Sequence, residues 1–279
     1  WQMTGEEKFR EVVEGIADYV LRELTHPEGG FYCAQDAQSE GKEGKCFCWT
    51  EKELVALLTP EEMKVAREVL GVSEKGNFID QSDPEPLPNQ NILSFKKPRK
   101  DLSSSDKKLV AGIFKKLAVV RGKRVPPATD DKILASWNGL MIGAMARTGR
   151  VLHEPKYLKA ARKAHDFIEG KFWDAKSKRL AHRWREGDRD DSAQAQSYLL
   201  FLAGTRKLYE ASLQKGDLEL AIGLAESAVE LVYDEKNGRC YQGEKRYDLV
   251  LRLTGQFDGS SPVESSIRTR VLWRLAQDP

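Results

Sequence analysis

The stretch that decides the fold reads Asp130-Asp131-Lys132-Ile133-Leu134-Ala135-Ser136-Trp137-Asn138-Gly139-Leu140. At helical spacing Asp130 and Trp137 share one face with Ile133, while Asp131 and Asn138 fall on the adjacent face. The pattern predicts a buried helix that begins with carboxylates, an ammonium, an indole and a carboxamide. Such a polar start indicates that the helix opens into a cleft. The alternative is a core helix that Asp130 or Asp131 only caps.

The composition is that of a globular protein with no strong charge bias. The 279 residues are 40% hydrophobic, which is enough for one large domain or two small ones. Lysine and arginine total 45 against 43 acids, so we expect neither nucleic acid nor a membrane as a partner. No window resembles a membrane helix or a signal-peptide core. The sequence therefore predicts a soluble, cytoplasmic protein.

The cysteines Cys33, Cys46, Cys48 and Cys240 are too few and too scattered for a disulfide framework and fit a reducing compartment. With His26, the first three could in principle bind zinc. The Cys-x-Cys spacing lacks the usual two-residue spacer, however, and favours one face of a strand. We therefore expect no metal and no cofactor, and assign the cysteines no role.

Helical periodicity dominates the chain and predicts an all-α fold. Amphipathic stretches occupy residues 6–24, 104–120, 131–148, 155–171, 192–213, 216–232 and 262–277. An irregular insertion at about 51–105 interrupts them, with short helices near 52–58 and 60–70. We expect one domain over residues 1–279.

An irregular repeat between the helices indicates how they are arranged. The segments that begin at Asp174 and Asp234 are equivalent and lie 60 residues apart, and His26–Tyr32 is a related turn. The repeating unit is a helical hairpin whose loop carries a small β-hairpin. Such hairpins stack into a solenoid or close into a ring. The long polar loops follow alternate helices and would crowd one mouth, which favours an α/α toroid.

Residues 29–50 form a second polar cluster, in which two short apolar runs flank an acidic, glycine-punctuated tip. This composition predicts a strand, a loop and a return strand. A solvated hairpin tip without a functional role is the alternative.

Residues 29–50, Arg121–Lys132 and Ser136–Ile142 together resemble the thioredoxin-domain-containing proteins related to spermatogenesis-associated protein 20. The resemblance is to the helical region that follows the thioredoxin domain, which is similar to N-acylglucosamine 2-epimerases and six-hairpin glycosidases. It implies an (α/α)6-barrel-like toroid with a cleft at one mouth. It also implies that a thioredoxin domain precedes residue 1 and that the last barrel helices follow Pro279, so that this chain holds an incomplete toroid.

The resemblance supplies most of the candidate site residues. Matching positions are Asp36, Ser39, Glu40, Arg121, Arg124, Asp130, Asp131, Lys132, Trp137 and Asn138. The family has an acid at Gln38, an acid before tyrosine at Ser197-Tyr198, and Ser-Gly-Asn at Val263–Ser265. One side of the expected cleft is thus retained and another altered.

The candidate catalytic residues are the carboxylates, since a glycosidase needs two of them about 5 to 10 Å apart. Asp36 or Glu40 opposite Asp130 or Asp131 could supply the pair. Capping and ion pairing with neighbouring arginines is the alternative, and would disfavour a general acid. The remaining candidates would bind ligand, and they are Ser39, Trp49, Arg121, Arg124, Lys132, Trp137, Asn138 and His182.

Two functions follow from these observations. The first is a carbohydrate-binding or carbohydrate-active domain resembling N-acylglucosamine 2-epimerase, with a small sugar or polyol as ligand. If active, it would be an epimerase or isomerase, or else a glycosidase. An epimerase needs an acid/base group on each face of the reacting carbon, and the sequence shows no histidine pair for this. The second function is therefore a non-catalytic toroid that binds a ligand or protein beside a thioredoxin domain.

Overall fold

The computed structural model describes residues 1–247, 249–255, 257–259 and 261–277. The chain divides into two compact units. The first unit consists of Trp1–Ala34 with Asp130–Pro279, and the second of Gln35–Thr129. The second unit is larger than the insertion predicted at about 51–105. The single domain over residues 1–279 stays a prediction.

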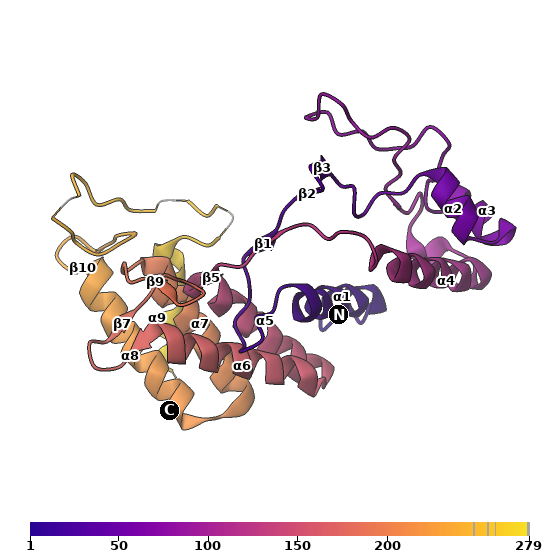
Figure 1. Ribbon diagram of the computed structural model, residues 1–279. Helices are drawn as coiled ribbons and strands as arrows, with labels where there is room; N and C mark the ends of the chain where they lie inside the picture. The colour runs from indigo at the N-terminus through magenta and orange to yellow at the C-terminus, as the bar shows by residue number, and fades with distance from the viewer. Residues whose placement is uncertain (248, 256, 260, 278–279) are drawn as a thin grey trace. The chain divides into compact units, whose positions relative to one another are not determined.

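The first unit is built from long helices joined by loops that contain short strands (Figure 1). Its helices are α1 (Glu7–Glu23), α5 (Ala135–Leu152), α6 (Pro155–Phe172), α7 (Ala195–Ser212), α8 (Lys215–Val232) and α9 (Glu264–Leu275). Its strands are β5 (Ile133–Leu134), β6 (Trp173–Asp174), β7 (Arg179–Leu180), β8 (Arg183–Arg185), β9 (Asp188–Asp190), β10 (Tyr233–Asp234) and β11 (Arg239–Cys240). β5, β8 and β9 form an antiparallel sheet, and the β6–β7 and β10–β11 pairs are the predicted hairpins.

The second unit contains two short helices, one long helix and a small hairpin. Its elements are α2 (Glu51–Leu57), α3 (Pro60–Glu68), α4 (Ser104–Arg121), a 3₁₀ turn (Arg99–Asp101) and the paired strands β2 (Gln38–Ser39) and β3 (Lys42–Glu43). Strands β1 (Ala34–Gln35) and β4 (Thr129–Asp130) contain the boundary between the units. Thr50 and Thr59 form capping boxes with Glu53 and Glu62, which explains the starts of α2 and α3.

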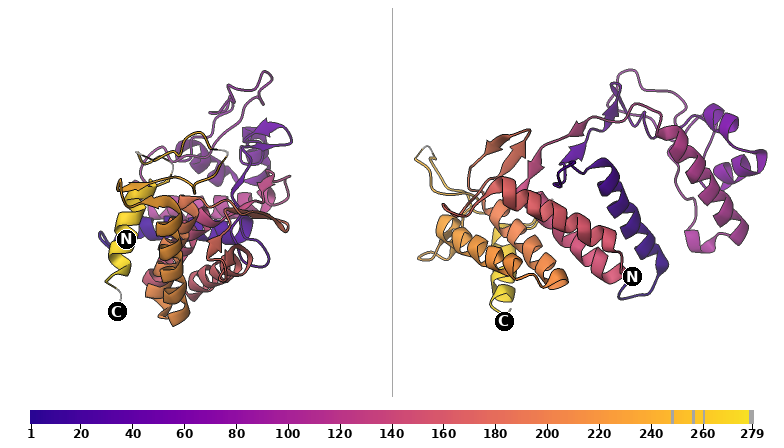
Figure 2. Two further views of the ribbon diagram at one scale, coloured as in Figure 1. Left: turned by 90° about the vertical axis from the view of Figure 1, so that its left-hand side faces the viewer. Right: turned by 60° about the horizontal axis from the view of Figure 1, so that its bottom comes forward.

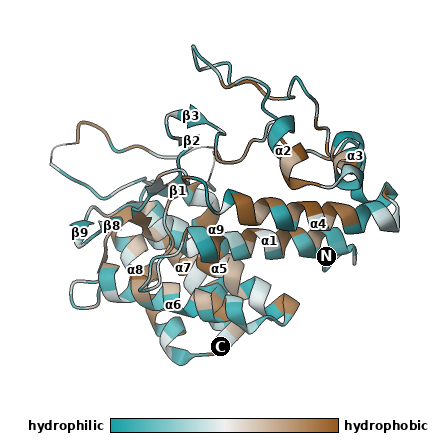
Figure 3. Ribbon diagram, turned by 45° about the vertical axis from the view of Figure 1, so that its right-hand side comes forward, coloured by the Kyte–Doolittle hydropathy of each residue, from teal (hydrophilic) through white to brown (hydrophobic). Residues whose placement is uncertain are grey.

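All seven long helices and both short helices predicted from periodicity are confirmed. Hydrophobic and hydrophilic residues alternate in bands along the long helices (Figure 3), as the amphipathic pattern requires. The predicted strand at Cys46 and Cys48 is wrong. The chain turns there instead, because Gly44 adopts a positive φ of 71° and its carbonyl accepts hydrogen bonds from the N–H groups of Phe47 and Cys48.

Helical hairpins stack side by side in the first unit (Figure 2). α5 packs against α6 and α7, and α7 packs in turn against α8 and α9. The inner helices α5, α7 and α9 therefore form one row, with α6 and α8 outside it. Inner and outer helices alternate along the chain in the same way in part of an α/α toroid. The all-α fold of hairpins with β-hairpins in the loops is confirmed.

The connections differ sharply between the two ends of the helix row. At one end α5 joins α6 through His153–Glu154, and α7 joins α8 through Leu213–Gln214. His153 and Leu213 adopt left-handed conformations there, with φ of 57° and 55°. The longer connections of the first unit instead run from the ends of α1, α6 and α8 to the starts of α5, α7 and α9. The polar loops therefore gather where α5, α7 and α9 begin, and this end is called the mouth below.

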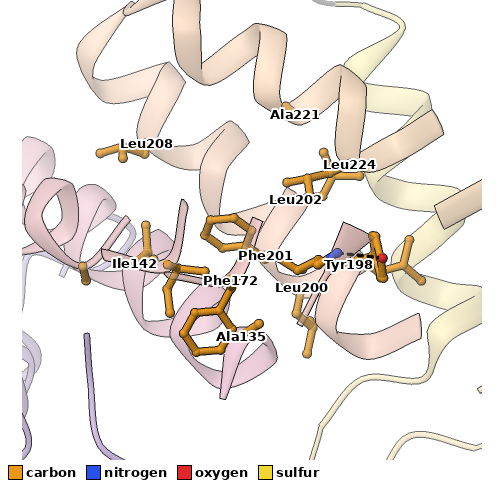
Figure 4. Packing of buried hydrophobic residues seen from close by; sticks show 14 of the residues in the cluster. Ala135, Ile142, Phe172, Tyr198, Leu200, Phe201, Leu202, Leu208, Ala221 and Leu224 are labelled. Atoms are coloured by element: carbon orange, nitrogen blue, oxygen red, sulfur yellow. Dashed lines mark hydrogen bonds between the residues drawn. The ribbon is translucent and has the colours of Figure 1, made fainter. Parts of the chain in front are cut away.

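The core of the first unit lies between these helices. Tyr198, Phe201 and Leu202 of α7 pack among Ile142 of α5 and Phe172 of α6 (Figure 4). The hydroxyl of the fully buried Tyr198 accepts a hydrogen bond of 2.8 Å from the N–H of Leu180. Because a buried hydroxyl needs a partner, this bond also positions the loop in front of α7.

Candidate functional site

The block Asp130–Leu140 lies at the mouth but is not helical from its start. β5 pairs with β8, so that Ile133 lies opposite Trp184, and α5 begins only at Ala135. The predicted helical positions of Asp130 and Asp131 are therefore wrong. The cause is a non-local pairing that the helical periodicity of residues 130–134 does not reveal.

The charged residues of this block form ion pairs. Asp131 Oδ1 lies 2.6 Å from Arg185 Nε, at the end of the β5–β8 ladder. Lys132 Nζ lies 3.2 Å from Asp130 Oδ2. All four side chains remain partly accessible to solvent, with 31 to 55% of each side chain exposed. A polar ligand could therefore reach them, although it would compete with their partners.

In the first turn of α5, the side chain of Trp137 is exposed to solvent, whereas that of Asn138 is buried. The Trp137 indole is 47% exposed, which leaves it available as a stacking surface. The Asn138 carboxamide is buried: it accepts a hydrogen bond from Phe31 N at 2.7 Å and donates to the carbonyls of Phe31 and Leu134 at 2.9 and 3.0 Å. These bonds give Asn138 a structural role, and its predicted contact with a ligand is untested.

His182 lies between β7 and β8 at the mouth. Its carbonyl accepts a hydrogen bond from Ala135 N, and its Nδ1 lies 3.0 Å from the Oγ of the buried Ser197. Burial, aided by Arg183, lowers the pKa of His182 against the opposing effect of Asp190. The imidazole is therefore neutral near pH 7 and could accept a proton. The hydroxyl of Ser197 holds the ring in place.

An open cleft of about 650 Å³ lies at the mouth beside the start of α7. It is formed by the loop after β9 and the loop after β11, and its lining consists of Asp190, Asp191, Ser192, Glu244, Lys245, Arg246 and Tyr247. A smaller hollow of about 200 Å³ shares Ser192, Glu244 and Arg246 with it. Sequence reasoning missed these residues because the two loops lie far apart in the chain and carry no recognisable motif.

Backbone hydrogen bonds connect the two loops that form this cleft. Ala195 N donates to Gln242 O at 2.9 Å, and Glu244 N donates to Ala193 O at 3.1 Å. Glu244 Oε1 additionally accepts from Ala193 N at 3.2 Å. The floor of the cleft is therefore held in a defined shape.

Two carboxylates of the cleft, Asp190 and Glu244, are held ionised near neutral pH by lowered pKa values. The N–H of Ser192, which donates to Asp190 Oδ1 at 2.9 Å, holds the pKa of Asp190 below its ordinary value. Burial alone would raise the pKa of Glu244, but Arg179 at 2.6 Å and the N–H of Ala193 outweigh it and lower that pKa. Neither group is suited to donate a proton as a general acid.

The second unit brings together another part of the predicted site. Ser39, Glu40 and Arg124 line a cavity of about 460 Å³, together with Lys45, Lys123 and other residues. Ser39 Oγ donates to Val125 O at 2.6 Å, which ties the β2–β3 hairpin to the segment after α4. Glu40 is exposed and pairs with Lys45 at 2.9 Å.

Arg124 acts mainly as a clamp within this unit. Its Nη1 donates to the carbonyls of Lys45, Cys46 and Cys48, at 3.3, 3.1 and 2.7 Å. The guanidinium lies 3.8 Å from the ring centroid of Trp49, which is itself only 3% exposed. Trp49 is therefore a core residue beneath a cation rather than an open stacking platform.

The remaining candidates of the second unit are Asp36 and Arg121. Asp36 is exposed, and its Oδ1 accepts from Gln38 N at 3.0 Å. The Arg121 guanidinium lies 5.6 Å from the Phe47 ring centroid. The pairing of Asp36 or Glu40 with Asp130 or Asp131 stays a prediction.

The first unit thus has the architecture of a helical-hairpin protein with a polar mouth. No family model matches the chain. Over 99% of its length it is 32% identical to spermatogenesis-associated protein 20 of Homo sapiens, and equally so to that of Mus musculus. It spans 39% of the length of each. The predicted resemblance to these proteins is confirmed, and the chain is a partial homologue of them.

Solved structures with similar folds include sugar-acting enzymes. A sugar epimerase from a ruminal bacterium matches at 15% identity with a TM-score of 0.43, covering 61% of this chain and 49% of that one. A D-mannose isomerase matches at 18% identity and 0.43, covering 62% and 48%. A family 105 glycoside hydrolase of C. acetobutylicum matches at 11% and 0.45, covering 100% and 68%. In the described part of this chain, every helix is too short or too polar to cross a membrane.

Proposed function

We propose that the first unit binds a carbohydrate or a similar polyol in the mouth cleft formed by Asp190–Ser192 and Glu244–Tyr247. The observation that carries this proposal is the lining of the cleft. The lining holds three carboxylates, two cations and a serine hydroxyl, and Tyr247 adds a fully exposed ring. Sugars present closely spaced hydroxyl groups and an apolar ring face, and this lining is complementary to both.

The protonation of the cleft favours binding over glycoside hydrolysis. A glycosidase needs one carboxyl group that stays protonated near the working pH. The pKa values of Asp190 and Glu244 are lowered instead, so neither carboxyl group stays protonated near neutral pH. Epimerisation needs two acid/base groups, of which the neutral His182 could supply one. A domain that binds sugar with little or no turnover therefore fits this chemistry best.

Calorimetric titration of the purified protein with a panel of mono- and disaccharides tests the proposal. We expect saturable binding of at least one sugar, weakened about three- to tenfold by Tyr247→Ala, which is the range expected for one aromatic contact. Tyr247 is fully exposed, so its removal should leave the melting temperature unchanged. Leu213→Ala is the matched control, because Leu213 is exposed at the opposite end of the helices. Failure of every sugar to bind, or equal binding by Tyr247→Ala, would reject the site.

An active epimerase-like enzyme is the competing function. Asp36, Glu40, Asp130 and Asp131 would then be its candidate acids and bases. Incubation with sugars in deuterated water distinguishes the two cases, since epimerisation at a carbon exchanges its hydrogen with solvent. Sugar turnover that disappears in Asp131→Asn would establish the enzyme. Binding without deuterium incorporation supports the non-catalytic function.

The setting of this unit is part of the proposal. The chain spans about two fifths of the length of these relatives. We propose that a thioredoxin domain of the same polypeptide accompanies it, that nucleic acid and membranes are not its partners, and that it is cytoplasmic. Sequencing of the full transcript and imaging of a tagged full-length protein test these points.

A further inference from the structure

His165 is a buried histidine on the outer helix α6, away from the mouth cleft. Its side chain is only 1% exposed, and its ring stacks on Phe201 of α7 at 5.4 Å between centroids. Neither ring nitrogen has a hydrogen-bond partner. A buried polar group without a partner destabilises the folded state. Such a group calls for a specific explanation.

Two carboxylates lie close to one of these nitrogens. His165 Nδ1 is 3.5 Å from Asp166 Oδ1 and 4.0 Å from Glu169 Oε2. The nitrogen and one oxygen from each acid all lie within 4.8 Å of one another. Ligand atoms around a tetrahedral metal ion are about 3.3 Å apart. Small side-chain rotations would therefore bring all three groups to ligating distance.

The surroundings of these three residues favour a cation. Asp166 and Glu169 place two carboxylates beside the imidazole of His165. Arg162 is the nearby counter-ion, but its guanidinium is engaged with Asp217 in two bonds of 2.6 Å and is 3.7 Å from Asp166. A positive ion next to Asp166 and Glu169 would relieve the remaining repulsion.

We propose that His165, Asp166 and Glu169 bind a divalent transition-metal ion, and specifically Zn²⁺. The acids are 59 and 49% exposed, so the ion can enter from solvent, while the imidazole provides the inner ligand. Mg²⁺ and Ca²⁺ prefer sites made of oxygen alone, whereas Zn²⁺ readily combines imidazole with carboxylates. Three protein ligands leave a fourth position for water. The proposal is independent of the sugar-binding function.

Zinc titration of chelator-treated protein tests the site. We expect one equivalent of Zn²⁺ to bind saturably and to raise the melting temperature. Asp166→Asn and Glu169→Gln should each weaken that binding at least about tenfold. Both residues are exposed, so the metal-free variants should fold as the wild type does. Glu219→Gln is the matched control, since Glu219 is an exposed acid on α8 that pairs with Lys215.

The same titration can overturn the proposal. If no Zn²⁺ binds saturably, the site does not exist. If Asp166→Asn and Glu169→Gln bind Zn²⁺ as tightly as the wild type, the metal is held by other residues, such as the cysteines. Equal binding of Mg²⁺ would overturn the assignment of the metal.

Discussion

Gly139 of α5 and Gly204 of α7 lie against each other where the backbones of the two inner helices touch. A Cβ atom on Gly204 would overlap the carbonyl oxygen of Gly139, and a Cβ atom on Gly139 would overlap that of Leu200. Because both obstacles are backbone atoms, a larger residue could be accommodated only if the helices separated. This contact sets the spacing of α5 and α7, and hence the position of the mouth residues that precede them.

Replacing Gly204 by alanine should therefore destabilise the protein although alanine favours helices. We expect a loss of about 3 kcal/mol, at the upper end of typical overpacking costs. Chemical denaturation of the purified variant measures it. Gly170→Ala on α6 is the matched control, since a Cβ atom there meets nothing within 4 Å. The control should be neutral or up to about 1 kcal/mol more stable. Equal effects of both changes would contradict the close contact.

Asn138→Asp tests the structural role of the buried carboxamide. The Asn138 Nδ2 donates to two carbonyls, and a carboxylate oxygen in its place would face both without a hydrogen. We expect destabilisation of about 3 kcal/mol at pH 7. The folded pKa of the new carboxyl should be raised, so the variant should recover stability below the unfolded pKa of about 4 and lose it as the pH rises. Denaturation at pH 4 and pH 7, compared with wild type, would show no such difference if Asn138 were simply a ligand-binding group.

Leu213→Gly should stabilise the turn between α7 and α8. Leu213 has a φ of 55°, a conformation costly for a residue with a Cβ atom, and its side chain is 75% exposed. Glycine relieves this backbone strain but loses more conformational entropy on folding. We therefore expect a net gain of about 0.5–1 kcal/mol in the free energy of unfolding. Leu213→Ala retains the Cβ atom and should change stability little. Thermal unfolding of the three proteins gives the comparison, and a loss of stability in the glycine variant would contradict the expectation.

His182 should make the stability of the protein sensitive to mild acid. Its folded pKa lies below the ordinary value because burial and Arg183 outweigh the attraction of Asp190. The unfolded chain therefore binds the proton more readily. The contribution of the neutral His182 ring to the free energy of unfolding is complete above the unfolded pKa of about 6.5. This contribution is lost as the pH falls below that value. Unfolding measured at pH 7.5 and 5.5 should show a larger acid-induced loss for the wild type than for His182→Asn, which can keep a bond to Ser197 without titrating. Parallel losses would contradict the burial of this ring.

Local periodicity was sufficient to predict the helices, since each long helix buries one face along its own sequence. The start of α5 was not predictable in this way. Ile133 and Leu134 fit a helix by composition but pair with Trp184 and Arg183 some 50 residues away. Asn138 is likewise bonded to Phe31 across 107 residues, and this distant contact decides that its side chain faces inward.

In the candidate site, too, some residues could be predicted from the sequence and others could not. The family likeness located Ser39, Glu40 and Arg124, which line one cavity. It did not indicate Asp190 or Glu244, because the mouth cleft depends on how two loops meet rather than on any contiguous motif. His165, Asp166 and Glu169 are close in sequence, yet only the burial of the imidazole distinguishes them from an ordinary helical surface.

The two ends of the helix row differ in how readily they can accept additional residues. At the tight turns, His153–Glu154 and Leu213–Gln214, an added residue would shift one helix against the next. At the mouth, extra length is accommodated without such a shift, and the whole second unit lies within one of these connections, between α1 and α5. Where the chain leaves and re-enters the first unit, Cys33 N donates to the carbonyls of Asp130 and Lys132 at 3.2 and 3.0 Å, so the first unit itself holds the two ends of this connection together. A scaffold of this kind can exchange or enlarge its accessory segments while its helices keep their registry.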